Sequence, residues 1–196
     1  MIRDLHFPTP IYTFYNSDNS FNQELEKNIL QWMKEDKGVS RTNVKGWHST
    51  TDMHQKPEYK KLTEALFEAQ FKIYKEEYLE SEPYLGGMWA NVNPPGGMNR
   101  AHQHPNSLWS GVYYVKTPEN CGKLMLYDPR DCAAIVFPRQ QKGKLPNRLY
   151  REIWYKPEAG KCIMFPSWLM HAVDPNESNE LRISVSFNFT QSCMMV

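Results

Sequence analysis

From Tyr84 onward, short runs rich in β-branched and aromatic residues alternate with turn sequences rich in Pro and Gly. The runs are "GGMWANVN", "SLWSGVYYVK", "GKLMLYD", "AAIVF", "LYREIWYKP", "GKCIMFP" and "LRISVSFNF". The breaks include "PPGG", "TPENCG" and "PEAG". This alternation is typical of an antiparallel sandwich or barrel. It predicts a mainly β core over residues 84–190, of the jelly-roll or double-stranded β-helix (cupin-like) class.

Helical periodicity dominates the region before this core. One helix is predicted over residues 19–36, with a cap at Asn19 or Ser20, and another over residues 56–80, with Pro57 in its first turn. Their apolar stripes are Phe21, Leu25, Ile29 and Trp32, and Tyr59, Leu62, Leu66, Ala69 and Ile73. Such stripes favour packing on the same domain. Residues 1–83 are therefore expected to be a helical N-terminal support within one domain spanning residues 1–196.

The composition argues against several kinds of partner. The chain has 196 residues and is 40% hydrophobic, which predicts a globular protein. A formal net charge of +1 argues against a nucleic-acid partner, which usually requires a basic surface. No apolar run suits a membrane span, and "MIRDLHFPTPIYTF" lacks the apolar centre of a signal peptide. We therefore expect a cytoplasmic protein without a membrane partner, while the oligomeric state stays open.

The stretch "RAHQHPNSLWSGVYYV" contains two histidines, His102 and His104, separated by one residue. In a strand, residues i and i+2 point to the same side, so the two imidazoles would converge on one point. Imidazole nitrogen is a good ligand for Fe, Zn or Ni. The pair is therefore a candidate half of a metal site, and the chain must supply a third ligand elsewhere.

A third histidine, His171, lies in a turn-like segment ahead of the predicted strand "LRISVSFNF". By strand parity, Arg182, Ser184, Ser186 and Asn188 share one face of this strand, and the opposite face is apolar. A guanidinium fork binds two carboxylate oxygens, and a neighbouring hydroxyl can donate a further hydrogen bond. Arg182 and Ser184 are therefore suited to bind a carboxylate.

Together these motifs resemble the 2-oxoglutarate- and iron(II)-dependent oxygenases, and most closely a small group from marine bacteria and their phages. The family pattern is a strand-borne His-x-Asp/Glu pair, a distant His, and an Arg-x-Ser about ten residues beyond it. The small group shows "HxHP", "SGVYYV", "DPR", "FPSWLxH" and "RISxSFN", and this chain contains each motif between His102 and Asn188. The resemblance covers roughly residues 47–189.

The resemblance implies that His102, His104 and His171 ligate Fe(II) as the catalytic centre, and that Arg182 and Ser184 bind the far carboxylate of 2-oxoglutarate. It implies a dioxygenase that uses O2, hydroxylates a substrate and releases succinate and CO2. Relatives have a carboxylate where this chain has His104. A three-histidine site keeps the same open coordination positions, with one more positive charge at the metal. Alternatively, Asp128 or Asp174 supplies a carboxylate, although "YDPR" and "VDPN" favour turn roles.

Two further side chains are candidates for the cosubstrate site. Asn93 shares one strand face with Trp89 and Asn91, and it either hydrogen-bonds the cosubstrate or stabilises the adjacent turn. Tyr113 and Tyr114 face opposite sides of a strand, so one of them faces inward. Tyr113 is the candidate for a keto-acid contact, with a core role as the alternative.

Other polar residues favour simpler roles. Arg100 and Arg130 either attract an acidic substrate group or are solvated, which is the usual state of exposed arginines. His48 and His54 lie in a loop with Asp52, and a polar surface loop is favoured over a metal site because nothing nearby completes one.

Two other functions stay open at this stage. A cupin-type three-histidine metalloenzyme would not use 2-oxoglutarate, but the glutamate of the cupin motif is missing near Ser107 and Leu108. A non-enzymatic jelly-roll module could use the aromatic residues Trp89, Trp109, Trp154 and Trp168. The substrate, a small molecule or a peptidyl side chain, is expected to be selected by residues 128–148 and by the N-terminal loops.

Overall fold

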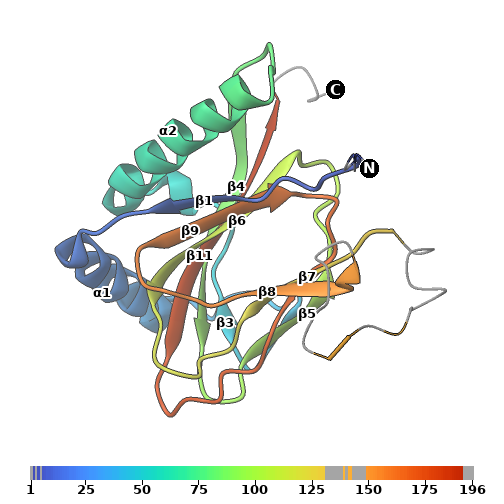
Figure 1. Ribbon diagram of the computed structural model, residues 1–196. Coiled ribbons are helices and arrows are strands. Elements are labelled where there is room, and N and C mark those ends of the chain that lie inside the picture. The colour runs from blue at the N-terminus through green and yellow to red at the C-terminus, as the bar shows by residue number, and fades with distance from the viewer. Residues whose placement is uncertain are drawn as a thin grey trace.

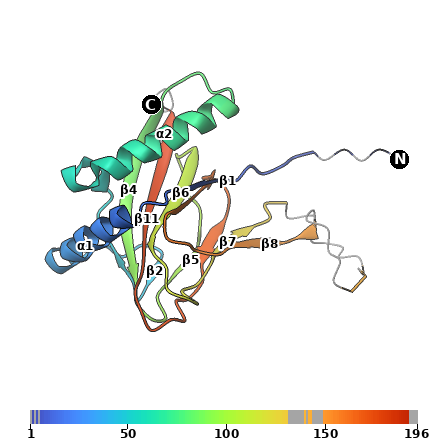
Figure 2. The ribbon, with the colours of Figure 1, turned by 60° about the vertical axis from the view of Figure 1, so that its left-hand side comes forward.

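Two antiparallel β-sheets form the body of the molecule, and two helices lie on the outer side of the larger sheet (Figures 1 and 2). The computed structural model describes residues 2, 4, 6–130, 139, 141–142 and 149–191. The larger sheet has the strand order β1-β9-β6-β11-β4-β3, and the smaller has the order β2-β5-β10-β7-β8. The predicted strand "AAIVF" and most of residues 128–148 lie outside the described part of the chain.

The strands of the larger sheet are β1 (Tyr12–Tyr15), β3 (Trp47–His48), β4 (Pro83–Asn93), β6 (Trp109–Lys116), β9 (Lys161–Pro166) and β11 (Arg182–Gln191). Those of the smaller sheet are β2 (Asn43–Val44), β5 (Met98–His102), β7 (Leu124–Tyr127), β8 (Glu152–Tyr155) and β10 (His171–Val173). Among the described residues, every predicted β-run therefore contains a strand. The predicted β-runs omit β1, β2, β3 and β10, which are too short or too polar to show a clear alternation, and β5 is anticipated only by the strand placement of His102.

The helices begin and end close to the predicted positions. Helix α1 spans Asn19–Glu35, and α2 spans Lys60–Glu76 after short 3₁₀ turns at Met53–Gln55 and Pro57–Tyr59. The cap of α1 is Asp18 and not Asn19 or Ser20, because the Asp18 carboxylate accepts the Phe21 N–H at 3.1 Å. All predicted stripe residues are buried except Trp32, which is half-buried. The stripes do pack on the same domain.

Strand β11 separates the core from the interior of the sandwich, as its parity predicts. Ile183, Val185 and Phe187 are completely buried in the core cluster that also contains the helical stripes. Burying these side chains between the sheet and the helices contributes to the hydrophobic stabilisation of this layer. The opposite face of β11, which starts at Arg182, is thereby turned toward the smaller sheet.

The N-terminal region is more than the helical support that the sequence predicts. Its strand β1 pairs with β9, β2 pairs with β5, and β3 pairs with β4. Residues 43–48 thus connect an edge of the smaller sheet to an edge of the larger one. Among the described residues, no helix combines the length and the apolar character that crossing a bilayer requires.

Candidate metal centre

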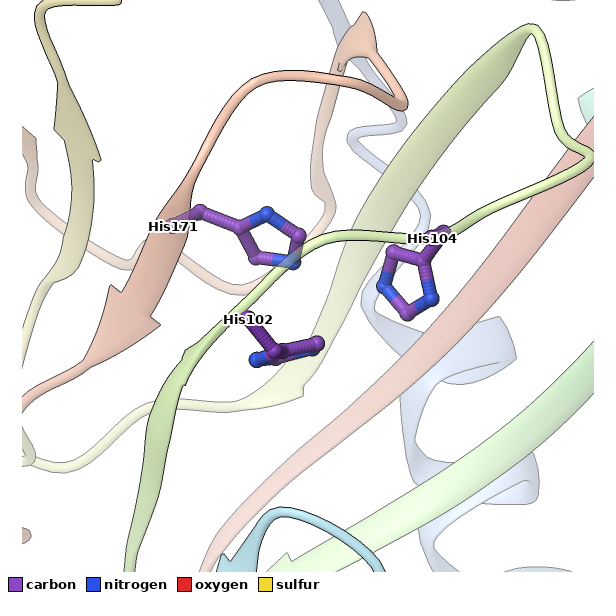
Figure 3. Close-up of side chains that lie close together, drawn as sticks. All are labelled: His102, His104 and His171. Carbon is purple, nitrogen blue, oxygen red and sulfur yellow. The ribbon is translucent and has the colours of Figure 1, made fainter.

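Three imidazoles meet at the end of strands β5 and β10 (Figure 3). His102 and His171 are direct cross-strand partners, and His104 follows two residues after the end of β5. One ligand nitrogen from each of the three residues lies within 4.8 Å of the others. The predicted strand placement is right for His102 and wrong for His104, which lies beyond the end of β5. Its backbone N–H instead donates to the Ser167 carbonyl at 3.1 Å, which holds it next to the other two rings.

Backbone carbonyls fix the orientation of two of these rings. His102 Nδ1 lies 2.7 Å from the Arg100 carbonyl oxygen, and His171 Nδ1 lies 2.9 Å from that of Leu169. A carbonyl only accepts hydrogen bonds, so each Nδ1 carries the proton and each neutral ring keeps the lone pair on Nε2. Metal-binding histidines usually have this arrangement, in which the second nitrogen donates to a carbonyl or carboxylate. The donor set therefore fits a metal ion.

Burial also keeps these imidazoles neutral. It is the main cause that lowers the pKa of His104 to about 4 and that of His171 to about 3, and the neighbouring His102 adds to both shifts. The pKa of His102 is lowered too, again by burial. At neutral pH all three rings can therefore offer lone pairs to a metal without first losing a proton.

These shifts predict acid destabilisation of the metal-free protein. The folded pKa values of His104 and His171 lie below the ordinary value of 6.5, so the unfolded chain binds protons that the folded chain does not. The stability that the two neutral imidazoles contribute to the folded state is fully present above pH 6.5, and it is lost as pH falls toward about 4. Thermal unfolding of metal-free protein from about pH 7 to 4.5 should show a falling Tm. The decline should be smaller by about 2 °C or more in His171→Asn. If the Tm fell equally in wild type and in His171→Asn, the buried histidines would not be the cause of the acid destabilisation.

Arg182 is buried in the same region without a counter-ion. Its side chain is 1% exposed, and Nη1 donates to the carbonyl of Cys121 and, at 3.2 Å, to that of Asp174. Its Nη2 is buried without a hydrogen-bond partner, and no ion pair among the described residues includes Arg182. Burial lowers the pKa of this guanidinium. A buried cation without an anionic partner is costly, which points to a ligand that supplies the anion.

A glycine lets the chain close over this guanidinium. Gly122 has a φ of +86°, which only glycine adopts without strain. A Cβ at this position would lie 2.7 Å from Arg182 Nη1. The turn that provides the Cys121 carbonyl therefore depends on Gly122.

Arg182 and the three histidines line one cavity of about 310 Å³ between the two sheets. The polar face of β11, which comprises Arg182, Ser184, Ser186 and Asn188, contributes one wall, as strand parity predicts. Asn91, Asn93, Tyr114 and Trp89 also line it. Among the described lining residues there is no Asp or Glu. The cavity is thus lined by neutral and positively charged groups.

Two of the predicted cosubstrate contacts have different outcomes. Asn93 lines the cavity opposite Arg182 in the β4–β11 register, and its Nδ2 is buried without a partner, so its role stays a prediction. The prediction for Tyr113 is wrong. Its hydroxyl donates to Asn22 Oδ1 at 2.6 Å in the core beneath the helices. Tyr114 is the residue that faces the cavity, and parity alone could not tell the two faces apart.

His48 also lines the cavity and is 5% exposed, although it is not among the predicted site residues. It is not part of a polar surface loop. Its Nδ1 donates to the Ser49 carbonyl at 2.6 Å, and its ring stacks on Trp89 at 5.4 Å between centroids and 9° between planes. Strand β3 has only two residues and gave no periodic signal, because its position depends on pairing with β4.

The other candidate carboxylates serve local structure. Asp128 makes two hydrogen bonds, of 2.8 and 2.7 Å, to the Arg130 guanidinium. Asp174 contributes its backbone carbonyl to Arg182. Neither belongs to the three-histidine group. The turn roles favoured by "YDPR" and "VDPN" fit this arrangement.

An antiparallel sandwich with three convergent imidazoles in its interior defines the class of mononuclear metal-binding proteins with a double-stranded β-helix. A sequence profile described as "Putative 2OG-Fe(II) oxygenase" matches residues 87–188. This chain belongs to that family of 2-oxoglutarate-dependent Fe(II) oxygenases, and Fe(II) and 2-oxoglutarate are its cofactor and cosubstrate. No curated protein sequence matches the chain significantly.

Solved structures share the fold at low sequence identity. A prolyl-4-hydroxylase from Pseudomonas putida is 16% identical with a TM-score of 0.68, and the match covers 93% of each chain. A prolyl hydroxylase from Trichoplax adhaerens, bound to a hypoxia inducible factor peptide, is 12% identical (TM-score 0.66, 94% of this chain and 84% of that one). The epimerase SnoN, with Fe3+, α-ketoglutarate and nogalamycin RO, is 10% identical (TM-score 0.69, 94% and 80%). The predicted double-stranded β-helix is confirmed.

Proposed function

We propose that His102, His104 and His171 hold the iron of this oxygenase, and that Arg182, helped by Ser184, holds the far carboxylate of 2-oxoglutarate. The observation that carries this proposal is the buried Arg182 guanidinium, whose Nη2 has no hydrogen-bond partner among the described residues and which lines the cavity that contains the histidines. A dicarboxylic keto acid can bind the metal with one end and offer a carboxylate to Arg182 with the other. A cupin-type metalloenzyme leaves Arg182 without a role.

Each side chain has a separate task in this proposal. The carbonyls of Arg100 and Leu169 orient two ligand rings, and those of Cys121 and Asp174 hold the guanidinium. The Ser184 hydroxyl lies on the same strand face, two residues after Arg182, and can donate to the same carboxylate. Asn93 is a further candidate donor. When bound, iron with 2-oxoglutarate supplies the oxidation of a substrate C–H by O2, with release of succinate and CO2.

The domain organisation is part of the same proposal. We regard residues 1–196 as one oxygenase domain, in which residues 1–83 support the β core. The pairing of β1, β2 and β3 with core strands supports this view.

The test combines binding with turnover. Protein loaded with Ni(II), which binds imidazole without starting the reaction, should bind 2-oxoglutarate in calorimetry, and metal-free protein should bind it far more weakly. Iron-loaded protein should convert labelled 2-oxoglutarate to labelled succinate in air and not under nitrogen. A 2-oxoglutarate affinity that is the same with and without metal would contradict the proposal. Oxygen consumption by the enzyme that depends on a substrate but not on 2-oxoglutarate would also contradict the proposal.

A further inference from the structure

The cavity contains a second arginine, Arg41, to which the proposed mechanism assigns no task. It lines the cavity together with Thr42 and His48, which come from the N-terminal loop that joins the two sheets. Its side chain is exposed, whereas that of Arg182 is buried. No ion pair of the described residues includes Arg41. The cavity thus has one buried guanidinium and one that is open to solvent.

Arg41 is held next to the metal-binding strand. Its backbone N–H donates to Asn43 Oδ1 at 2.7 Å, and Asn43 pairs with Asn99 of β5. The Thr42 carbonyl accepts the Arg100 N–H at 3.0 Å. Strand β5 also carries His102. A group bound by Arg41 would therefore be placed by the same strand that places a ligand of the metal.

The charge balance of the site favours an anion at Arg41. Fe(II) and three neutral imidazoles carry two positive charges, which the two charges of 2-oxoglutarate offset. The Arg182 charge then remains, whereas a carboxylate in place of His104 would have cancelled it. Since no described lining residue is acidic, nothing on this wall neutralises the excess. In a partly dehydrated cavity such an excess attracts an anionic group strongly.

We propose that the substrate oxidised by this enzyme is a small carboxylic acid whose carboxylate binds Arg41. This inference rests on the proposed function, because it assumes that 2-oxoglutarate occupies Arg182. The guanidinium fork matches a carboxylate in a bidentate pair. A volume of about 310 Å³ is at the lower end for ligand cavities, so a small acid fits beside the cosubstrate better than an extended chain. Trp89, stacked on His48, offers an apolar surface for the carbon skeleton.

The experiment uses matched probes, because the natural substrate is unknown. Protein saturated with Ni(II) and 2-oxoglutarate is mixed with a panel of small acids and their carboxamides, such as butyrate with butyramide and N-acetyl-leucine with N-acetyl-leucinamide. Ligand-observed NMR gives each Kd. Prior saturation with 2-oxoglutarate keeps the acids from Arg182. We expect at least one acid to bind about tenfold or more tightly than its amide, because the charged hydrogen bonds are the stronger ones.

Variants distinguish a direct contact between Arg41 and the carboxylate from a general electrostatic attraction of acids to the protein. Arg41→Gln should remove the preference for the acid, and Arg41→Lys should keep part of it. Lys45→Gln is the matched control, because it removes one positive charge from the same N-terminal loop, and Lys45 is exposed and does not line the cavity. It should retain the preference. A panel without any preference, or a preference that survives Arg41→Gln, overturns the substrate class. If 2-oxoglutarate fails to bind the metal-loaded protein, the proposed function fails first.

Discussion

Replacing Arg182 by methionine is expected to weaken 2-oxoglutarate binding by about 100-fold or more, because removal of one partner of a buried ion pair costs about 2–5 kcal/mol. The substitution keeps most of the side-chain volume. It also removes a buried charge that lacks a counter-ion in the described structure, so the metal-free, ligand-free protein should lose little stability. The Tm increase that 2-oxoglutarate causes in metal-loaded wild type should therefore disappear, while the basal Tm changes little.

Two further variants test whether the loss of 2-oxoglutarate binding is specific to the Arg182 guanidinium. Arg182→Lys keeps the positive charge and loses the planar fork, so it should bind 2-oxoglutarate with an intermediate affinity. Lys45→Met, outside the cavity, should bind it like the wild type. Calorimetric titration of Ni(II)-loaded protein measures all four affinities. If Arg182→Met bound 2-oxoglutarate as tightly as wild type, another residue would have to hold the far carboxylate.

Replacing His104 is expected to have the second large effect, and the direction depends on the substituent. His104→Ala removes one of three ligands and should weaken metal binding by about 100-fold or more, a larger loss than replacing a residue that only orients a ligand causes. His104→Asp replaces a neutral imidazole by a carboxylate, which is also a common ligand of iron. It should keep the metal, since the new ligand is negative, but weaken 2-oxoglutarate by several-fold, because the dianion then meets one less positive charge.

Competition with a metal chelator measures the metal affinity, and calorimetry measures that of 2-oxoglutarate. His48→Ala is the matched control. His48 lines the same cavity but stacks on Trp89 and lies outside the three-imidazole group, so metal affinity should be retained. Loss of metal from His48→Ala together with retention in His104→Ala would mean that the wrong imidazole has been assigned.

Strand parity predicted the wall of the cavity well. Arg182 and Ser184 were placed on one face of a strand, and the structure puts that face in the cavity and the alternate apolar residues in the core. Parity succeeds here because β11 is long and its two faces differ clearly in polarity, one being polar and the other apolar. It failed at Tyr113 because both faces of β6 are buried, so neither face has a distinguishing polarity.

Residues on short elements could not be predicted in this way. His48 and Arg41 reach the cavity only because β3 pairs with β4 and β2 pairs with β5. These pairings join residues far apart in sequence and leave no local periodicity. His104 lies next to the other two imidazoles, as predicted, but for a different structural reason. A backbone hydrogen bond to Ser167, and not strand geometry, brings it to the other two rings.

In the proposed site, the two sheets divide the chemistry between them. His102 and His171 belong to strands of the smaller sheet, whereas Arg182, Ser184 and Asn93 belong to the larger one. In the proposed complex, 2-oxoglutarate would span the gap and connect the two layers as a removable cross-link. Substitutions in one sheet could then change which metal is held while the choice of cosubstrate, encoded in the other sheet, stays the same. Such a fold can acquire a new metal-ligand set, such as one with three histidines, without rebuilding its cosubstrate pocket.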